Sequence, residues 1–210
     1  MKEYALGEIG TFWSGLLNTE QKLSGGDRTV RAVQPSDVPT QQTGVSEWDL
    51  PGALRTINPS QKNLEKSLLR KGDLILKTVG DFNACRVKSI ACDAVLVGHL
   101  QGIRMNPEFC LSEYFMWYST TLEFQRQIEQ QYTGTTMKRL KPKSLKETKI
   151  RIPEIQQQKK IARVYRGLQK IREIENAQSQ ARAVYSKGLF QKIERSLIQD
   201  EARASLKRKI

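Results

Sequence analysis

The chain has 210 residues, of which 38% are hydrophobic, and a formal net charge of +13. This length is sufficient for one well-packed domain with an appended element, and it is short for two full domains. No window approaches the roughly 20 consecutive apolar residues of a membrane-spanning helix, and the N-terminus lacks the apolar stretch of a secretory signal. We therefore expect a cytoplasmic protein that does not enter a membrane.

The sequence contains few residues that could support catalysis. Cys85, Cys92 and Cys110 are odd in number and are not spaced as metal-binding pairs, which predicts reduced thiols. The single histidine, His99, leaves no ligand set for zinc and excludes a Ser-His-Asp arrangement. Residues 147–149 have the E-x-K form of nuclease sites, but no aspartate lies close before them, so we interpret them as surface charge. We predict a protein that is not an enzyme and that carries no metal or cofactor.

The excess of positive charge lies in the last third of the chain. Residues 1–137 carry 14 Lys and Arg against 15 Asp and Glu, whereas residues 138–210 carry 21 against 7. Such an imbalance favours a polyanion, most simply nucleic acid, as a partner. A solvated basic helix that binds an acidic protein is the alternative.

Upstream of about residue 153, short runs rich in β-branched residues alternate with Gly, Pro, Asp and Asn. Runs of this kind are typical of strands separated by turns, so we predict one sheet or barrel. The predicted strands are residues 29–34, 73–79, 84–90, 94–100 and 148–152.

One helix is predicted among these strands. Asn106 is suited to the N-cap and Pro107 to the first helical position. The apolar residues that follow at helical spacing are Leu111, Phe115, Tyr118 and Leu122. This spacing directs the aromatic rings into the core, whereas a surface for stacking bases needs exposed rings.

Residues 36–61 contain three prolines and two glycines without sustained periodicity, which predicts a long loop. Trp48 lies in its middle. Such an indole either contacts a ligand or folds back as a plug over the core, and the sequence leaves both roles open.

From Pro153 onward the pattern predicts a helix over about residues 156–198. A narrow apolar seam runs along its first part, formed by Ile161, Val164, Leu168 and Ile171. At 1.5 Å per residue such a helix is roughly 60 Å long, too long to lie against one small domain. Its apolar stripe therefore needs another helix, for instance that of a second copy.

Five segments occur in an order that resembles the target recognition domain of type I restriction–modification specificity subunits. They are LGEIGTFWSG at 6–15, VRAVQPSDV at 30–38, LRKGDLILKTVG at 69–80, GTTMKRL at 134–140 and IRIPEIQQQKKIA at 150–162. Each segment is short, but their order and the long helix that follows cover most of the chain.

The resemblance implies an α+β fold, with a compact recognition domain over residues 1–153 and a spacer helix over 154–210 that pairs with another helix as a coiled coil. It implies that the domain reads one half of a split double-stranded DNA target and that the helix docks a DNA-methyltransferase subunit, with a restriction subunit as a further partner. S-adenosylmethionine and ATP would be bound by those partner subunits and not by this chain.

Family members usually have two recognition domains and two spacer helices, so this sequence resembles a half-subunit. Either two copies pair as a homodimer, or the chain is a truncated or specialised relative that uses its domain differently. Two other classes remain open: a free-standing dimeric DNA-binding protein, and an adaptor for an acidic partner that does not bind DNA.

The candidate DNA contacts come from the resemblance and from the basic charge. The resemblance places Thr135, Thr136, Lys138 and Arg139 near DNA phosphate. Further candidates in the basic loop, around the central β-turn and in the long loop are Lys141, Lys143, Lys77, Arg86, Lys88 and Trp48. We expect side chains of residues 39–60 to reach base edges, and we expect the seam residues named above to pair with a partner helix or to dock a partner subunit.

Overall fold

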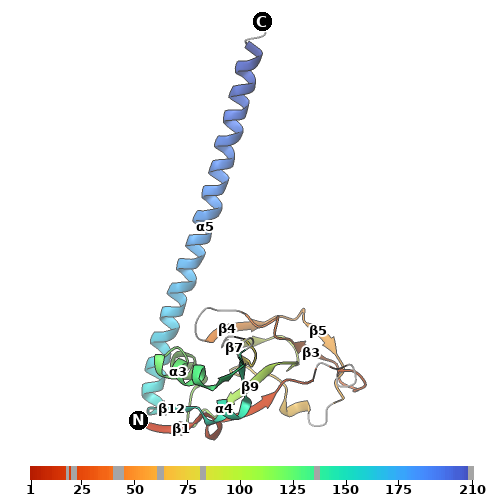
Figure 1. The fold of residues 1–210 in the computed structure, drawn as a ribbon, viewed down its shortest axis with the longest axis vertical. Coiled ribbons are helices and arrows are strands. Elements are labelled where there is room, and N and C mark those ends of the chain that lie inside the picture. The colour runs from red at the N-terminus through yellow and green to blue at the C-terminus, as the bar shows by residue number, and fades with distance from the viewer. Residues whose placement is uncertain are drawn as a thin grey trace. The chain divides into compact units, whose positions relative to one another are not determined.

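The computed structural model describes residues 1–17, 19, 23–39, 45–60, 64–80, 84–134 and 138–207, without the side chains of 45–46 and 196–207 (Figure 1). The chain divides into two units, Met1–Arg163 and Val164–Ile210. The first is a mixed α+β domain, as predicted, and the second continues one long helix. No helix within the described residues combines the length and the apolar character of a membrane span.

A five-stranded sheet forms the larger part of the domain. Its strands in spatial order are β2 (Gly10–Ser14), β9 (Leu100–Met105), β6 (Leu74–Lys77), β7 (Ala84–Ile90) and β4 (Val45–Leu50). Neighbouring strands are antiparallel, except that β4 runs parallel to β7. Three of the four residues of β6 and the first four of β7 are buried, which explains why both strands are continuous apolar runs rather than alternating ones.

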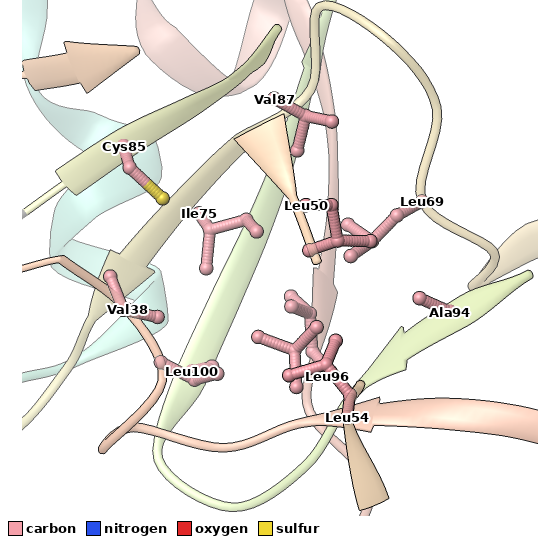
Figure 2. Close-up of a cluster of buried hydrophobic side chains, with 11 residues drawn as sticks. Val38, Leu50, Leu54, Leu69, Ile75, Cys85, Val87, Ala94, Leu96 and Leu100 are labelled. Atoms are coloured by element: carbon pink, nitrogen blue, oxygen red, sulfur yellow. The ribbon is translucent and has the colours of Figure 1, made fainter. Parts of the chain in front are cut away.

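A second sheet has three strands in the order β5 (Arg55–Ile57), β3 (Val30–Val33) and β8 (Ala94–Leu96). Apolar side chains from both sheets meet in one buried cluster, in which Ile75 and Leu100 of the larger sheet lie together with Leu96 of the smaller one (Figure 2). The main core of the domain therefore lies between the two sheets.

The predicted strands agree well with these elements. Residues 84–90 coincide with β7, and three other predicted runs contain β3, β6 and β12 (Lys149–Ile152). The run 94–100 is divided between β8 and the start of β9, because Gly98 adopts a positive φ of 75° and turns the chain between them.

The predicted loop at 36–61 was wrong over two stretches, since it contains β4 and β5. These strands are short, and their hydrogen-bonding partners are β7 and β3, which pattern reading along the chain does not connect to them. Trp48 lies on β4 and packs, partly buried, against the cluster between the sheets. The structure thus favours the second role that was open for this indole, a side chain that covers the core.

The predicted helix was wrong at both ends. Residues 106–109 form a turn in which the Asn106 side chain accepts a hydrogen bond from the N–H of Glu108, and α2 covers Ser112–Tyr118. A separate helix, α3 (Leu122–Gln131), follows, with the Thr121 hydroxyl as its N-cap. Leu122 is exposed for this reason, whereas Phe115 and Tyr118 are buried in the core as predicted.

The two ends of the domain come together in a small antiparallel pair. β1 (Lys2–Ala5) pairs with β12 over four residues, and α5 (Ile155–Lys207) begins directly after β12, as Figure 1 shows. The remaining elements are η1 (Leu6–Glu8), η2 (Leu64–Lys66), β10 (Tyr132–Thr133), β11 (Arg139–Leu140) and α4 (Pro142–Glu147).

The first turns of α5 are part of the domain. The side chain of Gln158 is fully buried, and its amide donates to the carbonyl oxygens of Phe109 and Pro153 at 2.8 and 3.0 Å. Its own carbonyl oxygen accepts the N–H of Leu111 at 2.9 Å. Because a buried amide is stable only when its polar atoms are paired, these three bonds define how the helix leaves the domain.

Candidate nucleic-acid interface

The basic segment that follows residue 137 is attached to one end of the five-stranded sheet. β11 pairs with β10, and the N–H of Leu140 donates to the carbonyl oxygen of Thr78, just beyond β6, at 2.9 Å. The N–H of Gly80 donates to the carbonyl oxygen of Lys138, also at 2.9 Å. These bonds bring the basic segment next to Lys77, the last residue of β6.

The same end of the sheet is fixed by a second contact. Thr78 donates both its backbone N–H and its hydroxyl to the carbonyl oxygen of His99, each at 3.1 Å. His99 directly precedes β9, the neighbour of β6. The basic segment is therefore mounted on a hydrogen-bonded scaffold and not on a free loop.

The basic side chains of this segment face outward. Lys138, Arg139 and Lys141 are exposed, and Lys143 is 88% exposed, with a weak contact of 3.9 Å to Glu147. The Nζ of Lys138 lies 5.7 Å from the ring centre of Tyr132, a distance suited to a cation–π contact.

The short helix α4 anchors the second half of the segment. Lys141 is its N-cap residue and Pro142 occupies its first turn, where the missing N–H of proline has no cost. Leu145, on the inner side of α4, is fully buried. We call the surface formed by Lys77, Lys138, Arg139, Lys141 and Lys143 the junction surface.

Two predicted contacts cannot be placed, because Thr135 and Thr136 lie outside the described residues. One basic residue was missed by the sequence analysis. Lys146 lies in the last turn of α4, with its Nζ 5.6 Å from the ring centre of Phe12. Its place in the basic run, three residues after Lys143, was the signal that would have found it.

Arg86 needs a correction, because its guanidinium is directed inward. Its side chain is 9% exposed and forms ion pairs with Glu47 at 3.0 Å and with Glu113 at 2.6 Å. Its Nε also donates to the hydroxyl of Ser112 at 2.9 Å. Arg86 is therefore a structural residue, and its charge is not available to DNA phosphate.

Lys88 is exposed but lies away from the junction surface. Along the β6–β7 pair, Leu76 is opposite Ala84 and Leu74 is opposite Arg86, so Lys88 lies beyond the opposite end of β6 from Lys77. Its Nζ is 3.5 Å from Asp49. The prediction that Lys77, Arg86 and Lys88 act together around one turn was therefore wrong.

Arg104 forms a second inward ionic contact. Its Nε and Nη2 donate to the two oxygens of Asp73 at 2.8 and 2.7 Å, and Nη2 also donates to the carbonyl oxygen of Leu68. The Asp73 side chain is almost fully buried and also accepts the N–H of Arg70. This bidentate pair is satisfied within the domain.

The described residues show no arrangement suited to metal chemistry, since no three His, Cys, Asp or Glu side chains among them lie close enough to hold an ion. Burial raises the pKa of the Cys85 thiol to about 12, and it raises that of Cys110 to about 12 as well. Thiols of this kind are protonated at neutral pH and are poor nucleophiles.

The seam residues differ in exposure. Val164, Leu168 and Ile171 are at least half exposed, whereas Ile161 is half-buried within the domain unit. Large apolar side chains with this exposure on an isolated helix are typical of a surface that another helix covers.

These observations define an α+β domain with an exposed basic surface that ends in a long helix with an uncovered apolar face. Residues 3–182 match the family described as type I restriction modification DNA specificity domain. The match covers most of the chain, and the chain therefore belongs to this family.

Solved structures share the fold. A chain from a structure that concerns the assembly and conformational transition of a type I restriction–modification system is 16% identical, with a TM-score of 0.58, over 87% of this chain and 42% of that one. The HsdS subunit from Thermoanaerobacter tengcongensis is 17% identical, with a TM-score of 0.53, over 80% of this chain and 37% of that subunit. The chain thus spans about two fifths of the length of these relatives. A comparison with curated protein sequences gives no match.

Proposed function

We propose that this chain is the sequence-recognition component of a type I-like methyltransferase complex, in which its domain reads one half of a split DNA target. The single observation that carries the proposal is the junction surface, a set of exposed basic side chains held on a hydrogen-bonded scaffold in a member of a DNA specificity family. Basic side chains fixed in this way neutralise phosphates and set the register of the protein on the duplex.

The near-neutral charge of residues 1–137 is compatible with this role because many of its acidic groups are occupied internally. Asp73 is neutralised by Arg104, and Glu47 and Glu113 by Arg86. The charge that remains on the junction surface is not cancelled by these carboxylates. DNA is therefore expected to approach the end of the sheet where β6 finishes.

The partners follow from the family and from the uncovered helix. We propose that α5 docks a DNA-methyltransferase subunit and pairs with the same helix of a second copy, which supplies the second half-site. A restriction subunit would join through the same assembly. Methyl transfer and ATP-driven steps would take place on the partners, which bind S-adenosylmethionine and ATP, while this chain supplies only recognition.

A second candidate is a free-standing dimeric DNA-binding protein. The observation that favours it is the row of exposed apolar side chains on α5, which is sufficient for self-association without a methyltransferase. Such a protein would bind its site tightly alone, whereas a recognition component needs its methyltransferase for full affinity. An adaptor that binds no DNA would show no dependence of binding on salt.

The test replaces four residues of the junction surface with alanine and measures binding to several DNA sequences across a range of salt concentrations. The residues are Lys138, Arg139, Lys141 and Lys143. We expect weaker binding to every sequence, with a log–log salt slope that is shallower by about 0.9 for each DNA phosphate that the variant no longer neutralises. The thermal midpoint should change little, because these side chains are exposed.

The matched control removes the same charge elsewhere on the domain. Lys66, Arg70 and Lys71 lie before β6, at the opposite end from Lys77, and Arg126 is exposed on α3. Alanine at these four positions should leave the salt slope unchanged. A slope that falls in the control variant and not in the junction variant would move the DNA to the other end of the sheet, and no salt dependence in the wild type would favour the adaptor.

A further inference from the structure

The exposed apolar side chains of Val164–Ile210 fall into two groups on either side of a polar centre. The first group is Val164, Leu168, Ile171 and Ile174, and the second is Val184, Tyr185, Leu189, Phe190 and Ile193. The residues between them, 175–183, read ENAQSQARA and contain no large apolar side chain. The helix therefore has two apolar ends and a polar middle.

Two charged residues lie in line with the apolar seam. Successive residues of a helix are rotated by about 100°, so Ile171 and Leu189, which are 18 residues apart, share one face. Glu175 follows Ile171 by four residues and Arg182 precedes Leu189 by seven, which places both on that face. A partner that covers the seam must also satisfy a carboxylate and a guanidinium, since an unpaired charge at such an interface is strongly unfavourable.

The pattern is symmetric under reversal of the chain direction. The centre of symmetry lies between Gln178 and Ser179. Val164 lies as far before this point as Ile193 lies after it, and Leu168 is related in the same way to Leu189. Glu175 and Arg182 are also equidistant from it. An antiparallel pair of identical helices with its two-fold axis at this point therefore places unlike charges opposite each other twice.

Other arrangements of two copies leave these charges without partners. A parallel pair in register places Glu175 opposite Glu175 and Arg182 opposite Arg182. An antiparallel pair shifted by seven residues in one direction places Glu175 opposite Leu189, and a shift in the other direction places it opposite itself. A polar group within an apolar seam is a known means of selecting one register, because the alternatives cost more than the correct pairing.

We propose that the seam of α5 binds a second copy of this chain in antiparallel orientation, with the two-fold axis between Gln178 and Ser179 and with Glu175 of each copy paired to Arg182 of the other. Val164 and Leu168 then pack against Ile193 and Leu189 of the other copy. The proposal rests on the proposed function for its biological meaning, because the axis fixes the separation of two recognition domains.

The first test exchanges the charges in the full chain and measures the dissociation constant of the dimer by sedimentation equilibrium. Glu175→Arg and Arg182→Glu should each weaken the dimer by tenfold or more, because each creates two pairs of like charges. The double variant should recover to within about threefold of the wild type. The control is Glu173→Arg, which makes the same change on the opposite side of the exposed helix and should have little effect.

The second test measures direction and register by chemical crosslinking. In a Cys92→Ser background, chains with Leu168→Cys are mixed with isotope-labelled chains with Leu189→Cys and treated with a short bis-maleimide. The remaining cysteines, Cys85 and Cys110, are buried. The expected product joins residue 168 of one chain to residue 189 of the other. A parallel pair would give links between two copies of residue 168.

Three results would overturn the proposal: a wild type that stays monomeric at micromolar concentration, a double charge exchange that does not recover, and a dominant link between identical positions. None of them affects the junction experiment, in which DNA binding and its salt slope are measured directly. The failure of this register is therefore distinguishable from the failure of DNA recognition. Links between residues 168 and 189 together with recovery of the double variant support it.

Discussion

The arginines inside the five-stranded sheet and the lysines of the junction surface carry the same charge, yet the domain uses them in opposite ways. The guanidinium groups of Arg86 and Arg104 are held by carboxylates within the domain. The ammonium groups of Lys141 and Lys143 are exposed on a short helix whose only fully buried side chain is Leu145. Net charge counted along a sequence therefore does not reveal which charges a partner can reach.

The comparison also explains how a near-neutral recognition domain can bind a polyanion. Paired charges inside the domain contribute to folding and little to the outer field, while the few exposed groups at one end of the sheet determine the approach of DNA. Variants that remove inward and outward charges should thus separate stability from binding.

The largest effect is expected for Arg86→Met. This change keeps most of the side-chain volume but leaves Glu47 and Glu113 facing each other without a cation. Breaking a buried ion pair typically costs 3–5 kcal/mol, and we expect roughly 3 kcal/mol because both carboxylates are partly exposed. Denaturant unfolding of the purified chain, followed by circular dichroism, measures this change.

The matched control is Lys88→Met, which removes a charge from the same strand on the outside. Its partner Asp49 is also exposed, and the pKa of that carboxyl is lowered first by the hydrogen bond from Ser89 and then by Lys88. An exposed pair contributes about 0–1 kcal/mol, so this variant should unfold almost as the wild type does. Equal losses in the two variants would contradict the distinction between inward and outward charges.

A smaller loss, on the order of 2 kcal/mol, is expected for Gln158→Leu. The substitution leaves the N–H of Leu111 and the carbonyl oxygens of Phe109 and Pro153 without their partner, and a buried unsatisfied group costs about 1–3 kcal/mol. The leucine recovers part of this cost through its apolar contacts. Hydrogen exchange of the Leu111 N–H, measured by NMR, should become faster in the variant.

Gln157→Leu provides the control, because Gln157 is the exposed neighbour of Gln158 on the same helix. It should leave both the stability and the exchange of Leu111 unchanged. If Gln157→Leu were as destabilising as Gln158→Leu, the effect would come from the helix itself and not from the buried hydrogen bonds.

The sequence predicted those parts of the fold that depend on local pattern. Continuous apolar runs such as the one at 84–90 identify central strands, and the start of α5 follows from Pro153 and the residues after it. It did not predict β4 and β5, whose pairing is decided by distant strands, nor the turn at Asn106, whose capping signal is shared by helices and turns.

The candidate site was predicted in the same uneven way. The basic run after residue 137 was visible as a charge pattern, and its attachment to the end of β6 required the structure. Arg86 was misassigned because the sequence cannot show that Glu47 and Glu113 lie on either side of it. Gln158 was passed over because nothing in a row of three glutamines distinguishes the buried one.

The smallest effect concerns the cysteines, where the contrast between inside and outside can be measured without any substitution. Burial raises the pKa of the Cys85 and Cys110 thiols to about 12, whereas Cys92 is partly exposed between β7 and β8. The thiolate is the reactive form, so at pH 8 only about one in ten thousand of the buried thiols is ionised. Iodoacetamide should therefore modify Cys92 first in the native protein and all three residues in denaturant, as read by peptide mass spectrometry. The same reagent applied to Arg86→Met should label Cys85 and Cys110 faster than in the wild type, because the destabilised domain opens more often. Equal labelling of the three cysteines in the native wild type would show that the core between the sheets is open to solvent, and the distinction drawn between inward and outward groups would then fail.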